Sequence, residues 1–513
     1  MSTRKEQESE PRAIRQLGHN EAYQLAMYML DQYRGTSVYC RYKIPSAFSS
    51  IKNYEKLKNT VNGAILRTVM KHPTLQVGIL GAGTKNPVWV QLDKLDIQHH
   101  IEWRSVDRGR HQEIQSIIES QLDTKFQDLE KRPGWRVISV LNELHPDILD
   151  VIFTWNHPNA DGMSGKLFHT DLLKILNMGH SLGPQYTSSG DVFDLPSSPL
   201  EFVPTTEKLT SLPVSVNFLL KALWEESKMA VIRRSALQAH WAPIRASPYK
   251  TRLRAFTIGS NACSNIRAAC REHKTTITGL LHGLTFLSLC WRTTDGNAIA
   301  FEGATTIDLR RFLPLGHSKY PEFVPEHTIG NFVSLMSHKF LTPLTMKIRS
   351  QIESIRHFNG DLSPELWDSM WTISSRVRSE IKKRLKLGLK NDPVGLMRHI
   401  PDWQKYLTNL AQKPRQYSWM VTNLGVLNGD PDLEANPKPL SEAWAITEAQ
   451  FSLSAETTSA AIMISPISVV GDRLCVAGSW QECIMRDGLA EHIMGDLEMW
   501  LGRIGSKSDR QAA

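Results

Sequence analysis

The sequence has few cysteines, and none of them is placed for a metal site or a disulfide framework. Six cysteines are spread over 513 residues, and no two of them form a C-x-x-C pair. Structural zinc sites and disulfide-rich secreted folds both depend on closely spaced cysteines. We therefore expect neither a bound metal ion nor a disulfide framework.

Long apolar runs are also missing. The N-terminal segment MSTRKEQESEPRAIRQLG is polar and lacks the apolar core of a secretory signal. No run approaches the roughly 18 consecutive apolar residues that a membrane-spanning helix requires. We expect a cytoplasmic protein without a spanning segment, and peripheral contact with a membrane surface stays open.

Nucleotide-binding signatures and basic tracts are absent as well. The sequence contains no phosphate-binding P-loop and no dinucleotide fingerprint. The net charge is +8, but no block of lysine and arginine is interleaved with aromatic residues. We therefore expect no nucleic-acid partner. The positive excess suits either an anionic small molecule or ordinary surface charge.

The length of the chain predicts more than one domain. A chain of 513 residues exceeds the size at which a single hydrophobic core keeps growing. The segment from Gly179 to Pro213 is rich in Pro, Ser, Thr and Gly, which is typical of a linker. We assign residues 1–185 to an N-terminal domain, 186–215 to the linker and 216–513 to a C-terminal domain, and we expect a monomer.

The apolar pattern alternates between helical and strand periods, which predicts an α/β (α+β) fold with helices on mixed sheets. Ile148–Phe153 is a continuous apolar run and predicts a buried strand, with a helical pattern following it. Thr275–Trp291 is apolar on nearly all sides and predicts a buried helix. Ser418–Leu427 is expected to form one strand.

The turn N-H-P-N-A-D-G after the first of these strands carries the strongest candidate chemistry. His157 titrates near neutrality and can accept a proton from an alcohol. A buried Asp161 would organise the loop through a basic partner, and Gly162 would let the backbone reverse. The structural alternative is that His157 caps the strand and Asp161 caps the helix that follows. Two such side chains alone are too few for a metal site.

Several segments together resemble one superfamily. The turn is similar to the HHxxxDG motif of the condensation-domain and CoA-dependent acyltransferase (BAHD-like) superfamily, and R-Q-L-G-H-N-E-A-Y resembles its R-x-L-G-x-x-E segment. T-I-D-L-R-R-F-L-P, I-G-N-F-V-S-L-M and T-N-L-G-V-L follow in the order of the superfamily. The resemblance covers essentially the whole chain and is closest to fungal alcohol O-acetyltransferases of secondary metabolism. Asn156 replaces the first histidine, which argues against a peptide-synthetase condensation domain.

The resemblance implies two chloramphenicol-acetyltransferase-like domains that meet at a central tunnel. Acyl-CoA, in particular acetyl-CoA, would be a co-substrate entering one face, and a small-molecule alcohol would enter the other. His157 would deprotonate the acceptor hydroxyl without a covalent acyl-enzyme and without a bound cofactor. Asp161 would be structural, and Lys71 and Arg136 are the candidates for its basic partner.

The resemblance also points to residues of the second half, each with a structural alternative. Thr422 and Asn423 would donate hydrogen bonds to the oxyanion, or simply form a strand-to-turn segment. Asp308, Arg310 and Asn331 would contact acyl-CoA or connect the two domains, and for the arginine an inter-domain ion pair is the preferred interpretation.

Alternative functions stay open at this stage. An N-acyltransferase, or a condensation-type enzyme that uses a carrier-protein thioester, would use the same base and fold. A non-catalytic binding protein is disfavoured because such a protein has no reason to keep His157 with Asp161. The basic segment Arg376–Lys390 has apolar residues on one face and reads as a solvated helix face. Membrane-surface binding and contact with the CoA 3′-phosphate are its alternatives.

Overall fold

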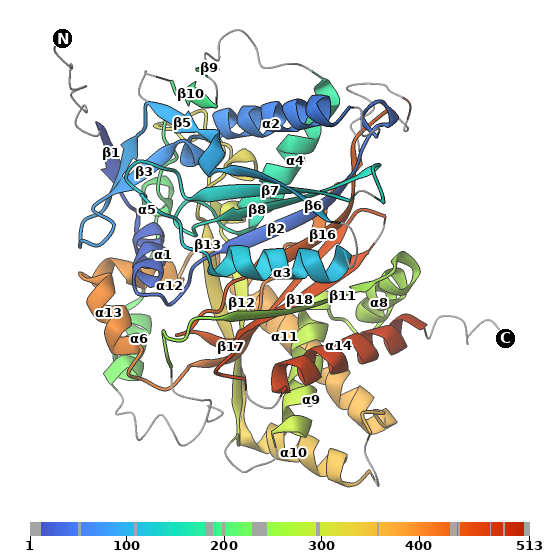
Figure 1. Ribbon diagram of the computed structural model, residues 1–513. Helices are drawn as coiled ribbons and strands as arrows, with labels where there is room; N and C mark the ends of the chain where they lie inside the picture. Colours follow the sequence, from blue (N-terminus) through green and yellow to red (C-terminus); the bar gives the residue numbers. More distant parts are fainter. Residues whose placement is uncertain are drawn as a thin grey trace, which may run out of the picture.

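A computed structural model of the chain contains two large mixed sheets, each covered by helices (Figure 1). The structure describes residues 12–49, 53–106, 110–142, 144–179, 188–189, 191–196, 201–227, 244–293, 298–355, 359–430, 439, 442–471, 473–485 and 488–506. The mixture of parallel and antiparallel strands with helices confirms the predicted fold class.

The first large sheet has five strands. In spatial order they are β16 (Ala445–Leu453), β2 (Thr36–Lys43), β8 (Ile148–Trp155), β7 (Trp135–Asn142) and β6 (Ile101–Val106). The pair β6 and β7 is parallel, and the other neighbours are antiparallel.

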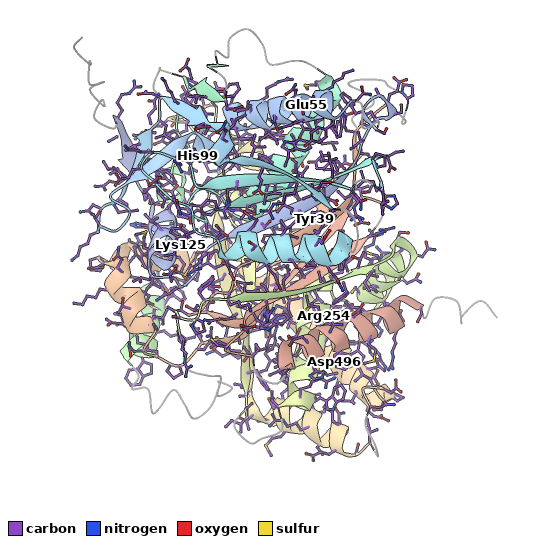
Figure 2. The ribbon with its side chains drawn as sticks, viewed as in Figure 1. Tyr39, Glu55, His99, Lys125, Arg254 and Asp496 are labelled. Carbon is purple, nitrogen blue, oxygen red and sulfur yellow. The ribbon has the colours of Figure 1, made fainter. Side chains whose placement is uncertain are left out.

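Both faces of this sheet are buried, and strand periodicity decides which residue faces which layer. On β8, Leu149, Val151 and Phe153 belong to the core shared with α2 (Tyr54–Lys71) and α4 (Gly162–Met178). Tyr39 of β2, labelled in Figure 2, faces α3 (Arg110–Asp123) on the opposite side. Because neither face meets water, the apolar run that predicted this strand does not alternate with polar residues.

The second large sheet has seven strands and carries the helices of the second half. The strands are β11 (Thr251–Ile258), β18 (Leu474–Gln481), β17 (Ala460–Val469), β14 (Tyr417–Val421), β12 (Phe301–Asp308) and β13 (Val333–Phe340), with β15 (Val426–Leu427) paired to β17. Its helices are α8 (Ser260–Glu272), α9 (Ile277–Arg292), α10 (Thr342–Glu353), α11 (Pro364–Lys386) and α14 (Leu489–Ser506). The helix predicted over Thr275–Trp291 corresponds to α9, which is buried from Gly279 to Cys290.

Smaller elements complete the chain. One three-stranded sheet contains β1 (Arg12–Gln16), β4 (Val88–Gln91) and β3 (Val77–Leu80). A second contains β5 (Lys94–Asp96), β10 (Val192–Asp194) and β9 (Ser188–Ser189). The remaining helices are α1 (His19–Met29), α5 (Thr206–Leu209), α6 (Val216–Ser227), α12 (Pro393–Leu396) and α13 (Trp403–Leu410), with 3-10 turns such as η7 (Met397–His399). Parts of the predicted linker 186–215 are thus ordered, because β10 pairs with β5.

One strand crosses between the two halves of the chain. β16 lies in the region assigned from sequence to the C-terminal domain, yet it pairs along its length with β2, from Ala445 opposite Lys43 to Leu453 opposite Thr36. Figure 1 shows this orange strand beside the blue β2. The first sheet is therefore completed by residues of the second half.

One predicted element is divided in the structure. The single strand expected over Ser418–Leu427 is two strands, β14 and β15. Gly425 adopts a positive φ of 72° between them, and its N–H donates to Asn423 Oδ1. The left-handed glycine interrupts the regular strand, although hydrogen bonds to β17 continue from Leu424 N–H to Pro466 O and from Ser468 N–H to Gly425 O. In the described part of the chain, no helix has the length and apolar character needed to cross a bilayer.

Candidate active site

The loop between β8 and α4 is held by its own polar groups. The Trp155 indole Nε1 donates to Ala160 O at 2.7 Å, and the Asn159 N–H donates to Asn156 O at 3.0 Å. Trp155 is completely buried. These bonds fold the five residues after the strand into a fixed turn, which places the His157 side chain at one position relative to the sheet.

Asp161 ends this turn as the N-cap of α4. Its Oδ1 accepts hydrogen bonds from Ser164 N and from Ser164 Oγ, both at 2.9 Å. A carboxylate at this position satisfies a free N–H of the first helical turn and complements the helix dipole. The structure therefore contains the capping interaction that the sequence left as an alternative.

Asp161 also forms a buried ion pair with the second half of the chain. Arg310 Nη1 lies 2.6 Å from Asp161 Oδ2, and the same oxygen accepts the Phe332 N–H at 2.9 Å. Arg310 Nη2 donates to Ser164 Oγ at 3.0 Å. Burial raises the pKa of Asp161, but the charge and hydrogen bonds of Arg310 outweigh it, so the pKa lies below its ordinary value.

The two expected partners of Asp161 were wrong. Lys71 Nζ pairs instead with Asp171 Oδ1 at 2.7 Å. The Arg136 guanidinium bonds Gln121 Oε1 at 2.8 Å. Both cations lie in the first half of the chain, whereas the true partner, Arg310, follows β12 in the second half. Arg310 accordingly forms an ion pair between the first and second halves of the chain, as its preferred structural interpretation expected of it.

The structure explains the glycine at position 162 differently from the sequence-based expectation. It is the first residue of α4 and is not among the glycines with positive φ. A Cβ atom at this position would lie 2.7 Å from Leu424 Cδ2 and 2.8 Å from Phe451 Cζ. The glycine thus permits close approach between the loop and residues of the second half, and it is not needed for the backbone to reverse.

His157 is buried and held from the second half by Asn331. The Asn331 amide Nδ2 donates to His157 O at 2.9 Å and lies 3.3 Å from His157 Nδ1, while its Oδ1 accepts from Asn20 Nδ2 at 2.8 Å. Burial lowers the pKa of His157, and the opposing effects of Asp161 and of the residue's own carbonyl are smaller. The imidazole is therefore neutral at physiological pH, which is the form that can accept a proton.

The His157 side chain lines a cavity of about 100 Å³ that both halves of the chain build. The other lining residues come from α1 and the segment after it, from β12, β13, β14, β16 and β17, from α12 and η7, and from the segments after β14 and β16. They are Asn20, Tyr23, Gln24, Met27, Tyr33, Thr306, Val333, Ser334, Leu335, Pro393, Val394, Met397, Met420, Thr422, Leu453, Glu456 and Met463. Most of this wall is apolar, as is usual for small-molecule sites.

The predicted residues of the second half separate into two groups. Thr422 lines the cavity, and its Oγ1 is 2.8 Å from Ser465 Oγ. Asn423 is exposed and donates to Thr278 Oγ1 at 3.0 Å, so it does not stand beside His157 as expected. Asp308 is half-buried, and its Oδ1 accepts the Arg310 N–H at 3.1 Å. Asp308 and Arg310 thus support the loop, and neither of them lines the cavity.

Two further sequence features have clear structural roles. In R-Q-L-G-H-N-E-A-Y, Arg15 pairs with Glu21 at 2.8 Å, and Glu21 also accepts the Gly18 N–H, which fixes the start of α1. In the basic segment, Val377 is buried while Lys382 and Lys383 are exposed, which agrees with a solvated helix face. Within the described residues, no group of three or more His, Cys, Asp or Glu side chains is arranged to hold a metal ion.

Sequence reasoning missed several residues of the cavity wall. Tyr33, whose ring centroid is 5.6 Å from that of His157, and Gln24 lie on or just after α1, and Glu456 follows β16. None of them belongs to a motif with a chemical spacing. The only available signal was the position of the first two close to the R-x-L-G-x-x-E segment.

Comparison with known proteins assigns the chain to a family. A family model described as alcohol acetyltransferase matches residues 94–487. A probable alcohol acetyltransferase of Fusarium pseudograminearum is 25% identical over 509 residues, which is 97% of each chain. An uncharacterized protein of Schizosaccharomyces pombe is 24% identical over 389 residues, covering 74% of this chain and 76% of the relative.

Solved structures share the fold. The TRI3 trichothecene 15-O-acetyltransferase from Fusarium sporotrichioides superposes with a TM-score of 0.69 and 12% identity, covering 96% of this chain and 94% of that one. The condensation domain of the Monacolin K polyketide synthase MokA gives a TM-score of 0.56 and 9% identity, over 97% and 99% of the chains. The resemblance found in the sequence is thus confirmed: the chain belongs to the alcohol acetyltransferase family and is an acyl-CoA:alcohol O-acyltransferase.

Proposed function

We propose that the protein transfers an acetyl group from acetyl-CoA to a hydroxyl of a small hydroxylated metabolite, with His157 as the general base. The observation that carries the proposal is a buried, neutral imidazole on the wall of a mostly apolar cavity shared by both halves. A related fold, F. graminearum TRI101 complexed with coenzyme A and T-2 mycotoxin, has a TM-score of 0.53 and 11% identity, over 94% of this chain and 96% of that one.

The proposed chemistry needs one proton acceptor. When Nδ1 of His157 carries the ring proton and donates to the residue's own carbonyl, Nε2 keeps a lone pair. Nε2 takes the proton of the acceptor hydroxyl as its oxygen attacks the thioester carbonyl. The tetrahedral intermediate then collapses, the C–S bond breaks, and the leaving thiolate of CoA receives the proton from the imidazolium.

The other residues position this base. Asn331 fixes the His157 carbonyl, and the pair of Asp161 with Arg310 holds the loop against the second half. Because Asp161 Oδ1 accepts two hydrogen bonds from Ser164 and Oδ2 accepts from Arg310 and Phe332, Asp161 acts on the structure and not on the acceptor. Thr422 is the cavity hydroxyl that we assign to the oxyanion.

The test is CoA thiol release from acetyl-CoA by purified protein, with pooled alcohols and pooled amines as acceptors. Substitution His157→Ala should lower acceptor-dependent release by about 10²- to 10⁴-fold, the range for loss of a general base. His99→Ala serves as the control, because this histidine (Figure 2) is exposed and lies outside the cavity. Release that persists in His157→Ala, or release with amines alone, would contradict the proposal.

A further inference from the structure

The cavity holds a carboxyl group besides the His157 imidazole. Glu456 follows β16 and is a lining residue of the same cavity. Its backbone carbonyl accepts a hydrogen bond from Arg415 Nη1 at 3.2 Å, which fixes the main chain at this point. Among the described residues, its carboxyl takes part in no ion pair within 4.0 Å, so it is not committed to a structural salt bridge.

The surroundings of Glu456 weaken its charge without removing its hydrogen-bonding capacity. Burial raises its pKa to about 7, although a hydrogen bond from Ser459 and the charge of Arg415 act in the opposite direction. Burial is the main cause that raises the pKa of the Tyr23 and Tyr33 hydroxyls, which share the cavity, and the nearby Glu456 raises it further. A carboxyl in this state is a good acceptor for a neutral hydroxyl and a poor counter-ion for a cation.

Gln24 provides a second, independent observation. This side chain on α1 lines the cavity and is only 8% exposed. Within the described structure its Oε1 has no hydrogen-bond partner. A buried amide oxygen without a partner costs about 1–3 kcal/mol, so such groups are normally satisfied. Over the part of the chain that the structure describes, the cavity thus presents one acceptor without a donor, Gln24 Oε1, besides the Glu456 carboxyl, which accepts a hydrogen bond from Ser459.

The rest of the wall favours an apolar ligand body. Four methionines with flexible, polarisable side chains surround the space, together with leucine and valine. They are Met27, Met397, Met420 and Met463. A ligand that fills this cavity is therefore mainly apolar but carries more than one hydroxyl.

Resting on the proposed function, we propose that the acceptor is an apolar diol or polyol, in which one hydroxyl is acetylated at His157 and a second donates a hydrogen bond to Glu456. Gln24 accepts from the same hydroxyl or from a third one. Glu456 is then a specificity residue for the acceptor. An amino alcohol is the weaker alternative, because Arg415 and the partial protonation of Glu456 both disfavour an ammonium group at this place.

The first experiment compares matched acceptors with the wild-type protein. Acetyl transfer from acetyl-CoA is measured with 1-alkanols, α,ω-alkanediols and ω-amino-1-alkanols of four to twelve carbons. We expect a diol of one length to exceed its matched alkanol in kcat/KM by about tenfold or more, the range for a hydrogen bond to a charged group. A wild-type protein without diol preference at any length, or with amino alcohol as its best acceptor, overturns the inference.

Three variants test whether Glu456 and Gln24 cause the preference for the diol. Glu456→Leu should reduce the diol-to-alkanol ratio to about one, chiefly by raising KM for the diol, while transfer to the alkanol persists. Glu456→Gln keeps an acceptor oxygen and should retain part of the ratio, and Gln24→Leu should lower it independently. Glu272→Leu, on the exposed face of α8, makes the same substitution outside the cavity and should leave the ratio unchanged.

The outcomes separate this inference from the proposed function. Equal losses for diol and alkanol in Glu456→Leu mean a structural role and overturn the inference, as does an unchanged ratio. A wild-type protein that acetylates no acceptor refutes the proposed function itself. Thermal unfolding of each variant shows whether the compared proteins are equally folded.

Discussion

The contact between Asp161 and Arg310 is the residue-scale feature on which the site depends. Both side chains are buried, and they come from segments 149 residues apart. Removal of one partner leaves the other as an unpaired buried charge, whose desolvation is no longer offset. The net contribution of the ion pair to stability is therefore smaller than the destabilisation expected when either charge is buried without its partner.

We predict that Arg310→Met lowers the free energy of unfolding by about 3–5 kcal/mol. The double variant Asp161→Asn with Arg310→Met should lose less than the sum of the two single variants, because no unpaired charge remains. Urea denaturation followed by tryptophan fluorescence measures these differences. Strictly additive losses would contradict the prediction. Arg12→Met, at the exposed pair with Asp93, is the control and should cost about 1 kcal/mol or less.

At the residue scale, the sequence predicted those site residues that lie close together in the chain. His157 and Asp161 were found because they share one short motif with Gly162. The partner of Asp161 was missed because a pairing between distant segments has no local signature, and both candidate cations, Lys71 and Arg136, lie in the first half of the chain. Gln24 and Glu456 were missed for the same reason: only folding brings their side chains to one cavity.

At the scale of elements, the packing of α4 on β8 sets the position of the loop that carries His157. Gly165 on α4 faces the Trp155 ring, and a Cβ atom there would lie 2.3 Å from its Cη2 atom. Trp155 is completely buried and cannot move aside. The helix would therefore have to shift away from the sheet, and the loop that carries His157 would shift with it.

We predict that Gly165→Ala destabilises the fold by about 1–3 kcal/mol, the usual range for overpacking, and lowers acetyl transfer as well. Gly502→Ala is the matched control, because this glycine on α14 has no heavy atom within 4 Å of an added Cβ. Alanine is the better helix former, so the control should be neutral or up to about 1 kcal/mol more stable. Similar unfolding midpoints for the two variants would refute the prediction.

Element types followed from periodicity, whereas strand order did not. The helix at α9 and the strand at β8 were predictable because their apolar residues form long uninterrupted patterns. The single strand expected over Ser418–Leu427 was wrong, whereas the strand-to-turn alternative for Thr422 and Asn423 agrees with the break between β14 and β15. The pairing of β16 with β2 was missed, because sheet order is decided by contacts between distant segments.

For the molecule as a whole, buried neutral histidines set the response to acid. Burial lowers the pKa of His100 and of His169 to about 4, from an ordinary value near 6.5. Between these values the unfolded chain binds protons that the folded chain does not bind. Stability is therefore present above pH 6.5 and decreases as the pH falls toward 4.

We predict that each of these two histidines removes on the order of 2–3 kcal/mol of stability between pH 7 and pH 4.5. The measurement is the free energy of unfolding in urea at both pH values. In His169→Gln one of the titrating groups is absent, so the loss on acidification should be smaller by a similar amount. An equal loss in the wild type and in this variant would show that His169 does not contribute.

The crossing strand also has a consequence for synthesis on the ribosome. The edge of β2 that β16 covers is made early, and β16 emerges roughly 400 residues later, which takes about 20–80 s at typical elongation rates. During that interval a strand edge with free N–H and C=O groups invites pairing with other nascent chains. Translation speed and chaperone supply should therefore limit the yield of this protein in a foreign host.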